Sequence, residues 1–250
     1  MLAIGLIALW AWPESRAWLQ QCSLTLFAVL NGSMADAPVW SHVVAIANIR
    51  AIDLGTATIM AIFLLKGGWV VDRAAVRRVF VGFILLLIWL LLFREILLSP
   101  LSHWAGWKLP SPSMAVDGAI STASHVGPFR VKAGDHTSFP GDHAAVLFAW
   151  LGYLLLVGNL RRFWWWFVPA ALLVLVMMLP RLIIGAHWLT DNLIGGVAIA
   201  ALSLAWTCMT PLMGLCLDWV LPAVERSVRK LNQWWPATAR WAFFDLSVER

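Results

Sequence analysis

The sequence predicts an all-α membrane protein, a polytopic bundle of about six transmembrane helices. Of its 250 residues 61% are hydrophobic, only 12% are charged, and the mean hydropathy is +0.80. A soluble domain carries about twice that charged fraction. Several apolar runs also approach or exceed the roughly 20 residues that a helix needs to cross a bilayer. We therefore expect membrane lipids, and no nucleic acid, as partners, and the sequence leaves the oligomeric state open.

Charges and prolines divide the apolar sequence into six candidate spans, at about residues 2–12, 39–65, 79–98, 144–160, 163–179 and 189–215. The first is short, but no basic residue precedes it and no small-residue cleavage pattern follows it, so we expect a membrane helix rather than a signal peptide. Residues 15–35 are mildly amphipathic and are expected to lie along the membrane interface. We expect a transmembrane catalytic domain at residues 1–218 and a cytoplasmic C-terminal tail at residues 219–250.

Lysine and arginine gather in three segments, and this asymmetry predicts the topology. The connection after the second span holds Lys66, Arg73, Arg77 and Arg78, the connection at residues 161–162 holds two arginines, and the tail is also basic. The positive-inside rule makes these segments cytoplasmic. Both termini are then cytoplasmic, and the connections at residues 99–142 and 180–190 are periplasmic. A bacterial inner-membrane protein with a periplasmic site is the expected result.

The most informative segment runs from Pro180 to Asp191. His187 and Asp191 are four residues apart, so on a helix they share one face. A carboxylate there accepts the proton of one imidazole nitrogen and leaves the other nitrogen as a nucleophile. Arg181 adds a forked set of donors suited to phosphate oxygens. This pattern favours phosphoryl transfer through a phosphohistidine.

A second segment, Ser138-Phe-Pro-Gly141-Asp142-His143, opens the fourth span. Proline marks a helix start, and the backbone N–H groups exposed there attract phosphate, so Ser138, Gly141 and Asp142 are candidate phosphate-binding residues. His143 is placed to protonate a departing oxygen.

The loop before this segment is basic. Lys108 and Lys132 are candidate phosphate-binding residues, and each is equally well explained as a lysine at a lipid headgroup; Arg130 lies in the same loop. Two histidine segments on one predicted membrane face, preceded by a basic loop, argue against a set of unrelated polar anchors.

The remaining polar residues suggest no further chemistry. The histidines show no H-E-x-x-H or Cys/His spacing, so no metal and no cofactor is expected. Arg50 and Asp53 are three residues apart within the second apolar span, where ionisable groups are costly. We expect them to pair with each other, and a contact with a lipid diphosphate is the alternative.

These motifs resemble the type 2 phosphatidic acid phosphatase superfamily, whose motifs run K-x6-R-P, P-S-G-H and S-R-x5-H-x3-D. Arg181-x5-His187-x3-Asp191 matches the third, with Pro180 in place of serine. Pro140-Gly-Asp-His143 keeps the proline and histidine of the second. Of the first, Lys108 is present, but no Arg-Pro follows at the expected distance. The departures are similar to those of the lipid A phosphotransferase branch of this superfamily.

The resemblance implies a phosphatase-like helical fold and a phosphate transfer from undecaprenyl diphosphate to the 1-phosphate of lipid A. It implies His187 as nucleophile, Asp191 as the residue that orients it, His143 as general acid, and Arg181 with Lys108 as phosphate ligands. Two alternatives stay open. A plain lipid phosphatase would use the same residues with water as acceptor, and a lipid transporter would spread its charges through the membrane midplane.

Overall fold

The computed structural model describes residues 1–122, 134–159, 161 and 163–247. The helices are α1 (Leu2–Ala11), α2 (Pro13–Gly32), α3 (Pro38–Ala47), α4 (Arg50–Leu65), α5 (Val76–Leu92), α6 (Ser99–Trp104), α7 (Pro112–Ala115), α8 (Asp142–Val157), α9 (Phe163–Ile183), α10 (Val197–Cys208) and α11 (Leu212–Trp234). Short 3-10 turns occur at Arg73–Ala75 and Pro236–Arg240, and π-helical segments at Phe93–Leu98 and Asp191–Gly196. No strand occurs among these residues, so the predicted all-α class is confirmed.

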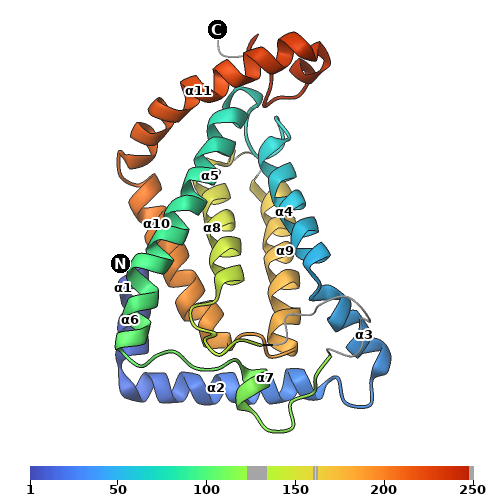
Figure 1. Ribbon diagram of the computed structural model, residues 1–250, viewed down its shortest axis with the longest axis vertical. Coiled ribbons are helices and arrows are strands. Elements are labelled where there is room, and N and C mark those ends of the chain that lie inside the picture. The colour runs from blue at the N-terminus through green and yellow to red at the C-terminus, as the bar shows by residue number, and fades with distance from the viewer. Residues whose placement is uncertain (123–133, 160, 162, 248–250) are drawn as a thin grey trace.

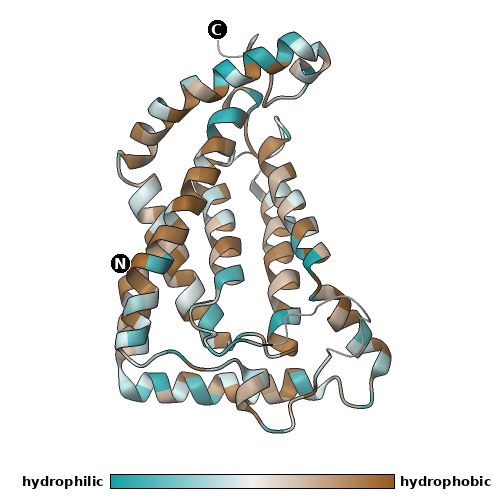
Figure 2. Cartoon of the chain, viewed as in Figure 1, coloured by the Kyte–Doolittle hydropathy of each residue, from teal (hydrophilic) through white to brown (hydrophobic). Residues whose placement is uncertain are grey.

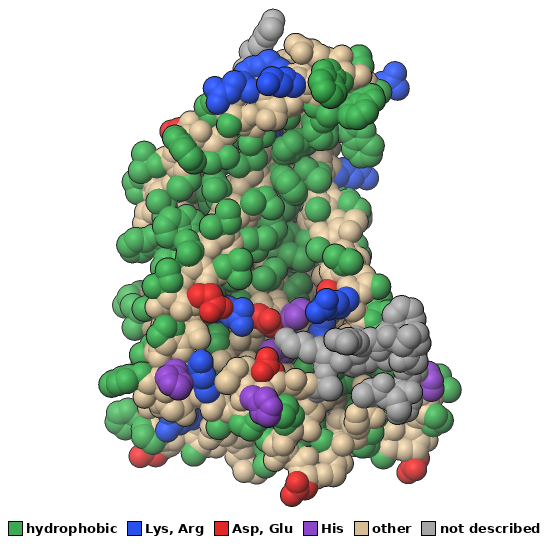
Figure 3. All heavy atoms as spheres, viewed as in Figure 1, with side chains coloured by type: hydrophobic (Ala, Val, Ile, Leu, Met, Phe, Trp, Pro, Cys, Tyr) green, Lys and Arg blue, Asp and Glu red, His purple; other side chains and the backbone are tan. Residues whose placement is uncertain are grey.

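An apolar bundle separates two polar ends of the molecule (Figure 1). Helices α4, α5, α8, α9 and α10 run along the long axis, whereas α2 lies across one end and α11 across the other. The long-axis helices are mostly hydrophobic (Figure 2), and apolar side chains cover the middle of the face in Figure 3. Helix α8 runs through the core, where Trp150 and Leu154 are fully buried. An apolar belt between polar ends is the surface that a bilayer requires.

The count of six spans is not confirmed. Three helical stretches within the described residues are long and apolar enough to cross a membrane: Arg73–Trp104, Trp164–Ile183 and Asp191–Cys208. The expected first and fourth spans form the shorter apolar helices α1 and α8. The sixth expected span ends early, because the chain turns between Cys208 and Leu212 and continues as α11.

The expected second span is two helices rather than one, because the chain bends at Asn48. The side-chain amide of Asn48 donates to Val44 O at 2.8 Å and to Pro180 O at 3.2 Å. The first bond satisfies a carbonyl group of α3 that would be costly in an apolar surrounding. The second adds a donor to Pro180 O, which also accepts the N–H of Ile184. The bend lets α4 begin beside α9 and places Asp53 at that contact.

The basic connections and the tail meet at one end of the bundle. Asn159 N donates to Val70 O at 2.8 Å, which joins the connections that follow α8 and α4. Arg73 pairs with Asp245 at 3.2 Å, and Arg77 donates to the carbonyl oxygen of Phe243 at 3.0 Å. The lysine and arginine side chains at this end are visible beside α11 in Figure 3. Helix α11 runs through the expected domain boundary at residues 218–219, and that division stays a prediction.

Helix α2 supports the opposite end, where both histidine segments lie. The buried side chain of Asn31 donates to Ile183 O at 2.9 Å and to Ile120 O at 3.2 Å. Ser23 Oγ accepts the N–H of Thr190 at 3.3 Å. Helix α2 therefore fixes both edges of the turn that carries His187.

Candidate active site

His187 lies in a tight turn that follows α9. Gly185 has φ of +70°, and a Cβ built there would lie 2.6 Å from the Phe27 ring, so only glycine fits this position without strain. The N–H of Ser113 donates to Gly185 O at 3.0 Å and holds the turn from outside. The turn leaves the His187 side chain only 4% exposed.

The surroundings of His187 define which ring nitrogen can act as a nucleophile. Its Nδ1 lies 3.2 Å from the carbonyl oxygen of Ser138 and 3.8 Å from Asp191 Oδ2. A carbonyl oxygen can only accept, so Nδ1 carries the proton and donates it. The expected orienting residue, Asp191, thus stands behind a nearer backbone acceptor, and its Oδ2 accepts the N–H of Trp188 at 2.8 Å. The lone pair of His187 is on Nε2.

His187 Nε2 is buried and accepts no hydrogen bond from any described residue. It lies 3.4 Å from Asp142 Oδ1. Buried polar atoms in proteins are almost always paired, so an unpaired one marks a place for a ligand or for chemistry.

Asp142 and His143 begin helix α8 and form a compact pair. Asp142 Oδ1 accepts the backbone N–H of His143 at 2.8 Å and lies 2.9 Å from His143 Nδ1. On the other side of the ring, His143 Nε2 lies 3.6 Å from Asp53 Oδ2. Asp142 was expected to help bind phosphate. Its carboxylate instead lies between two imidazoles. There it accepts hydrogen bonds, and its negative charge repels a phosphate anion.

Gly141 joins the two histidine segments. Its N–H donates to Asp191 O at 3.0 Å, and a Cβ would lie 2.5 Å from Asn192 Oδ1. The close approach explains why glycine stands where the second motif has serine. It also means that the Gly141 N–H, which was expected to face phosphate, already has an acceptor.

Arg181 and Asp53 form an ion pair across α9 and α4. Arg181 Nη2 lies 2.7 Å from both carboxylate oxygens of Asp53 and 3.4 Å from His143 Nε2. The expected partner of Asp53, Arg50, is exposed instead. Arg181 is only 4% exposed, and its Nη1 has no hydrogen-bond partner among the described residues. One arm of this guanidinium is therefore held by protein and the other is available.

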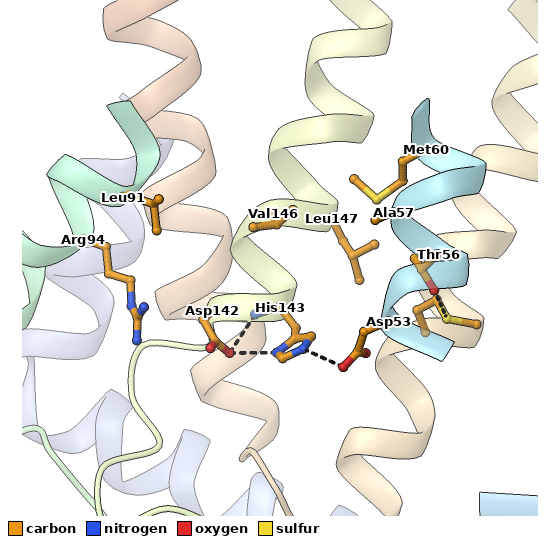
Figure 4. Close-up of a pocket in the computed structure, with 11 residues that line it drawn as sticks. Asp53, Thr56, Ala57, Met60, Leu91, Arg94, Asp142, His143, Val146 and Leu147 are labelled. Atoms are coloured by element: carbon orange, nitrogen blue, oxygen red, sulfur yellow. Dashed lines mark hydrogen bonds and ion pairs between the residues drawn. The ribbon is translucent and has the colours of Figure 1, made fainter. Parts of the chain in front are cut away.

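A pocket of about 290 Å³ leads to these residues (Figure 4). At its polar end, Asp142 and His143 lie between Arg94 of the π-helical segment and Asp53 of α4. The walls above are apolar and come from Ala57, Met60, Leu91, Val146, Leu147 and Met177. His187 is not among the lining residues, so Asp142 stands between the pocket and His187. Asp53 and Arg94 are the two charged pocket residues that were not among the predicted site residues.

The other expected phosphate ligands are placed differently. Ser138 is buried, and its hydroxyl donates to Leu109 O at 3.1 Å. Lys108 donates to Ser99 Oγ at 3.4 Å, and no hydrogen bond or ion pair joins it to the described residues of the histidine cluster. Lys132 and Arg130 lie outside the described residues.

Three side chains of the cluster are also grouped as metal ligands are. Asp142, His143 and His187 each offer one ligand atom, and these atoms lie within 4.8 Å of one another. The expectation of no metal rested on sequence spacing, and spacing does not reveal ligands from turns 44 residues apart.

Residues 83–213 match the family model of the PAP2 superfamily, and this range contains both histidine segments. The chain belongs to the PAP2 superfamily. Lipid A 1-diphosphate synthase of Escherichia coli (strain K12) is 26% identical to it over 220 residues, which cover 85% of this chain and 86% of the relative. No solved structure matches. Asp53 lies outside the range that matches the PAP2 model.

Proposed function

We propose that this protein is a lipid phosphotransferase that forms a phosphohistidine on His187. The observation that carries the proposal is the pair of unpartnered polar atoms, His187 Nε2 and Arg181 Nη1. One is a nucleophile with its tautomer fixed, and the other is a donor suited to a phosphate oxygen. Both lie in the range that matches the PAP2 model. A phosphoryl group supplies a phosphorus atom for Nε2 to attack and an oxygen to accept the hydrogen bond of Nη1.

In the first step, His187 Nε2 attacks the terminal phosphorus of a lipid diphosphate. A P–N bond forms, the P–O bond to the rest of the donor breaks, and the lipid monophosphate leaves. Ser138 O accepts a hydrogen bond from Nδ1–H and stabilises the positive charge that develops on the ring. His143, held between Asp142 and Asp53, gives its proton to the departing oxygen.

In the second step, a phosphate oxygen of the acceptor lipid attacks the same phosphorus. The P–N bond breaks and its electron pair returns to Nε2, and His143 takes back a proton from the acceptor phosphate, so the enzyme is restored. Burial of His187 supports transfer over hydrolysis, because a phosphohistidine in a water-poor site survives until the acceptor arrives.

The donor is undecaprenyl diphosphate, and the acceptor is the 1-phosphate of lipid A. The apolar walls of the pocket suit a prenyl chain that lies beside the bundle, with its diphosphate at the charged end. The name of the relative, lipid A 1-diphosphate synthase, supports a lipid A phosphate as acceptor. The products are lipid A 1-diphosphate and undecaprenyl phosphate.

The deciding experiment follows the terminal phosphate. Purified protein receives undecaprenyl diphosphate labelled in its terminal phosphate, with and without lipid A. We expect the label on lipid A, and little free phosphate when lipid A is absent. Free phosphate released at equal rates in both reactions, with none on lipid A, would mean that the protein is a phosphatase.

The site faces the periplasm, and the protein lies in the inner membrane. Support comes from the separation of the basic end from the histidine end, because basic segments stay on the cytoplasmic side. In a variant without Cys22, Cys208 and Cys216, we expect an impermeant thiol reagent added outside spheroplasts to label Asp117→Cys and not Arg78→Cys. Both positions are exposed. Labelling of Arg78→Cys and not of Asp117→Cys would show that the orientation in the membrane is the opposite of the one proposed.

A further inference from the structure

We propose that Asp142, His143 and His187 form a binding site for a divalent transition-metal ion, of which Zn²⁺ is the model, and that the bound ion silences the enzyme. The starting observation is His187 Nε2, which belongs to a side chain 96% buried and has no hydrogen-bond partner among the described residues. It is aimed at Asp142 Oδ1. A metal ion there binds the lone pair of Nε2 and also Asp142 Oδ1, which already accepts the backbone N–H of His143.

The distances fit a tetrahedral ion. With bonds of about 2.0–2.1 Å, two ligand atoms of such an ion stand about 3.3 Å apart. Asp142 Oδ1 and His187 Nε2 are 3.4 Å apart, and Asp142 Oδ1 and His143 Nδ1 are 2.9 Å apart. The ligand atoms of the three side chains lie within 4.8 Å of one another, so the side chains must move closer for all three to bind one ion, which leaves a fourth position for water.

The outer contacts are those of a metal site. A histidine that binds a metal normally donates its other N–H to a carbonyl or carboxylate, which fixes its tautomer. His187 Nδ1 does so toward Ser138 O, with Asp191 behind it. His143 Nε2 lies 3.6 Å from the carboxylate of Asp53, although Arg181 Nη2, a donor, is nearer to it at 3.4 Å. Binding through His143 Nδ1 releases the proton that this nitrogen now shares with Asp142.

The charge of the cluster favours a cation. Three carboxylates, from Asp53, Asp142 and Asp191, lie in or beside the cluster, together with the guanidinium groups of Arg181 and of Arg94, which lines the same pocket. With both imidazoles neutral, these groups carry one net negative charge, which attracts a cation. The ligand set of two imidazoles and one carboxylate suits Zn²⁺, Co²⁺ or Ni²⁺ better than Mg²⁺, which prefers oxygen ligands.

The consequence for turnover rests on the proposed function. An ion on Nε2 occupies the lone pair that attacks phosphorus, and it holds the Asp142 carboxylate between the pocket and His187. The metal-bound protein is therefore a closed resting form. Phosphoryl transfer requires release of the ion.

The test reads metal binding directly. Purified protein, freed of metal with a chelator, is titrated with Co²⁺. We expect one equivalent to give the intense visible absorption of tetrahedral Co²⁺, and Zn²⁺ to displace it. Asp142→Asn and His187→Gln should each weaken Co²⁺ binding by at least about tenfold. Even the loss of a residue that only supports a metal ligand costs about that much. His103→Gln, which alters an exposed histidine outside the cluster, is the matched control.

Activity gives the second readout. Zn²⁺ should inhibit phosphotransfer by the unaltered protein, chelator should restore it, and Mg²⁺ at the same concentration should not inhibit. The metal-site proposal fails if Co²⁺ shows no one-to-one absorption, or if Asp142→Asn binds it unchanged. Failure of the proposed function looks different, because a protein without phosphotransfer activity would still show the Co²⁺ spectrum.

Discussion

Arg77 and Arg181 are both buried, they lie at opposite ends of the bundle, and their guanidinium groups are satisfied differently. Arg77, 2% exposed, donates to the carbonyl oxygens of Phe243 at 3.0 Å and Asp245 at 2.9 Å. Arg181, 4% exposed, directs Nη2 to Asp53 and leaves Nη1 without a partner among the described residues. The first arginine fastens the tail to α5. The second keeps one donor without a partner among the described residues, at the end that holds both histidine segments.

The difference extends to the residues around each arginine. Near Arg77, Arg73 pairs with Asp245, and hydrogen bonds from Ser247 hold the pKa of the Asp245 carboxyl below its usual range, so this ion pair persists at mildly acidic pH. Near Arg181, three carboxylates and two imidazoles share one cluster, and His187 Nε2 is unpaired. The satisfied groups at the first end suit a structural role, whereas unsatisfied atoms among clustered ionisable side chains are typical of functional sites.

The largest effect is expected at His187. His187→Gln should lower turnover by at least about 10⁴-fold, because no other group can form the P–N bond. The unaltered protein, given labelled donor without lipid A, should retain a protein-bound label that is labile in acid and stable in base. His187→Gln should retain none, and His103→Gln should behave as the unaltered protein does. A label of this kind on His187→Gln would place the nucleophile elsewhere.

His143→Gln should have the next largest effect, a loss of about 10²–10⁴-fold with the natural donor, since a general acid contributes that much. A donor whose leaving group needs no proton separates this role from simple positioning. With p-nitrophenyl phosphate as donor, His143→Gln should lose much less of its rate than it loses with the natural donor. An equal loss with both donors would show that His143 positions phosphate and transfers no proton.

The two arginines provide a matched pair. Arg181→Met should lower kcat/KM by about 10²–10³-fold, the usual cost of one donor to a developing charge. Arg77→Met should leave turnover per folded molecule unchanged and should lower the free energy of unfolding in detergent by about 1.5–3 kcal/mol for each hydrogen bond lost from the charged group. Thermal unfolding and initial rates, measured on the same samples, separate a loss of stability from a loss of activity. Loss of activity in folded Arg77→Met would contradict the division between the two ends.

The sequence was sufficient for the local features of this molecule. Apolar runs predicted an all-helical membrane bundle, and the spacing of Arg181, His187 and Asp191 indicated the segment of the candidate site, which stays a prediction. Both follow from patterns within about 20 residues. The number of spans was not obtained, because the break at Asn48 depends on a bond to Pro180 that lies 132 residues away.

The contacts within the cluster were harder to predict for the same reason. Asp53 was expected to pair with Arg50, on its own helix, but it pairs with Arg181, 128 residues away. Asp191 was expected to orient His187, but a backbone carbonyl at Ser138 lies nearer. Every residue has a backbone carbonyl, so no sequence pattern predicts which one accepts the hydrogen bond of His187.

The smallest effect is expected at Ser138, where the chain uses the backbone rather than the side chain. In Ser138→Ala the carbonyl oxygen still accepts the His187 N–H, and the hydroxyl is lost with its bond to Leu109 O and its interaction with the Asp191 carboxylate. A neutral hydrogen bond such as the one to Leu109 O contributes about 1 kcal/mol to stability. We therefore expect kcat/KM for the donor to stay within about threefold of the unaltered protein, which is less than 1 kcal/mol at the transition state. If the hydroxyl bound phosphate directly, its loss would cost more than tenfold, because a bond to a charged group contributes about 1.5–3 kcal/mol. A tenfold fall in folded Ser138→Ala would thus return Ser138 to the phosphate site and remove the contrast between its carbonyl and its side chain.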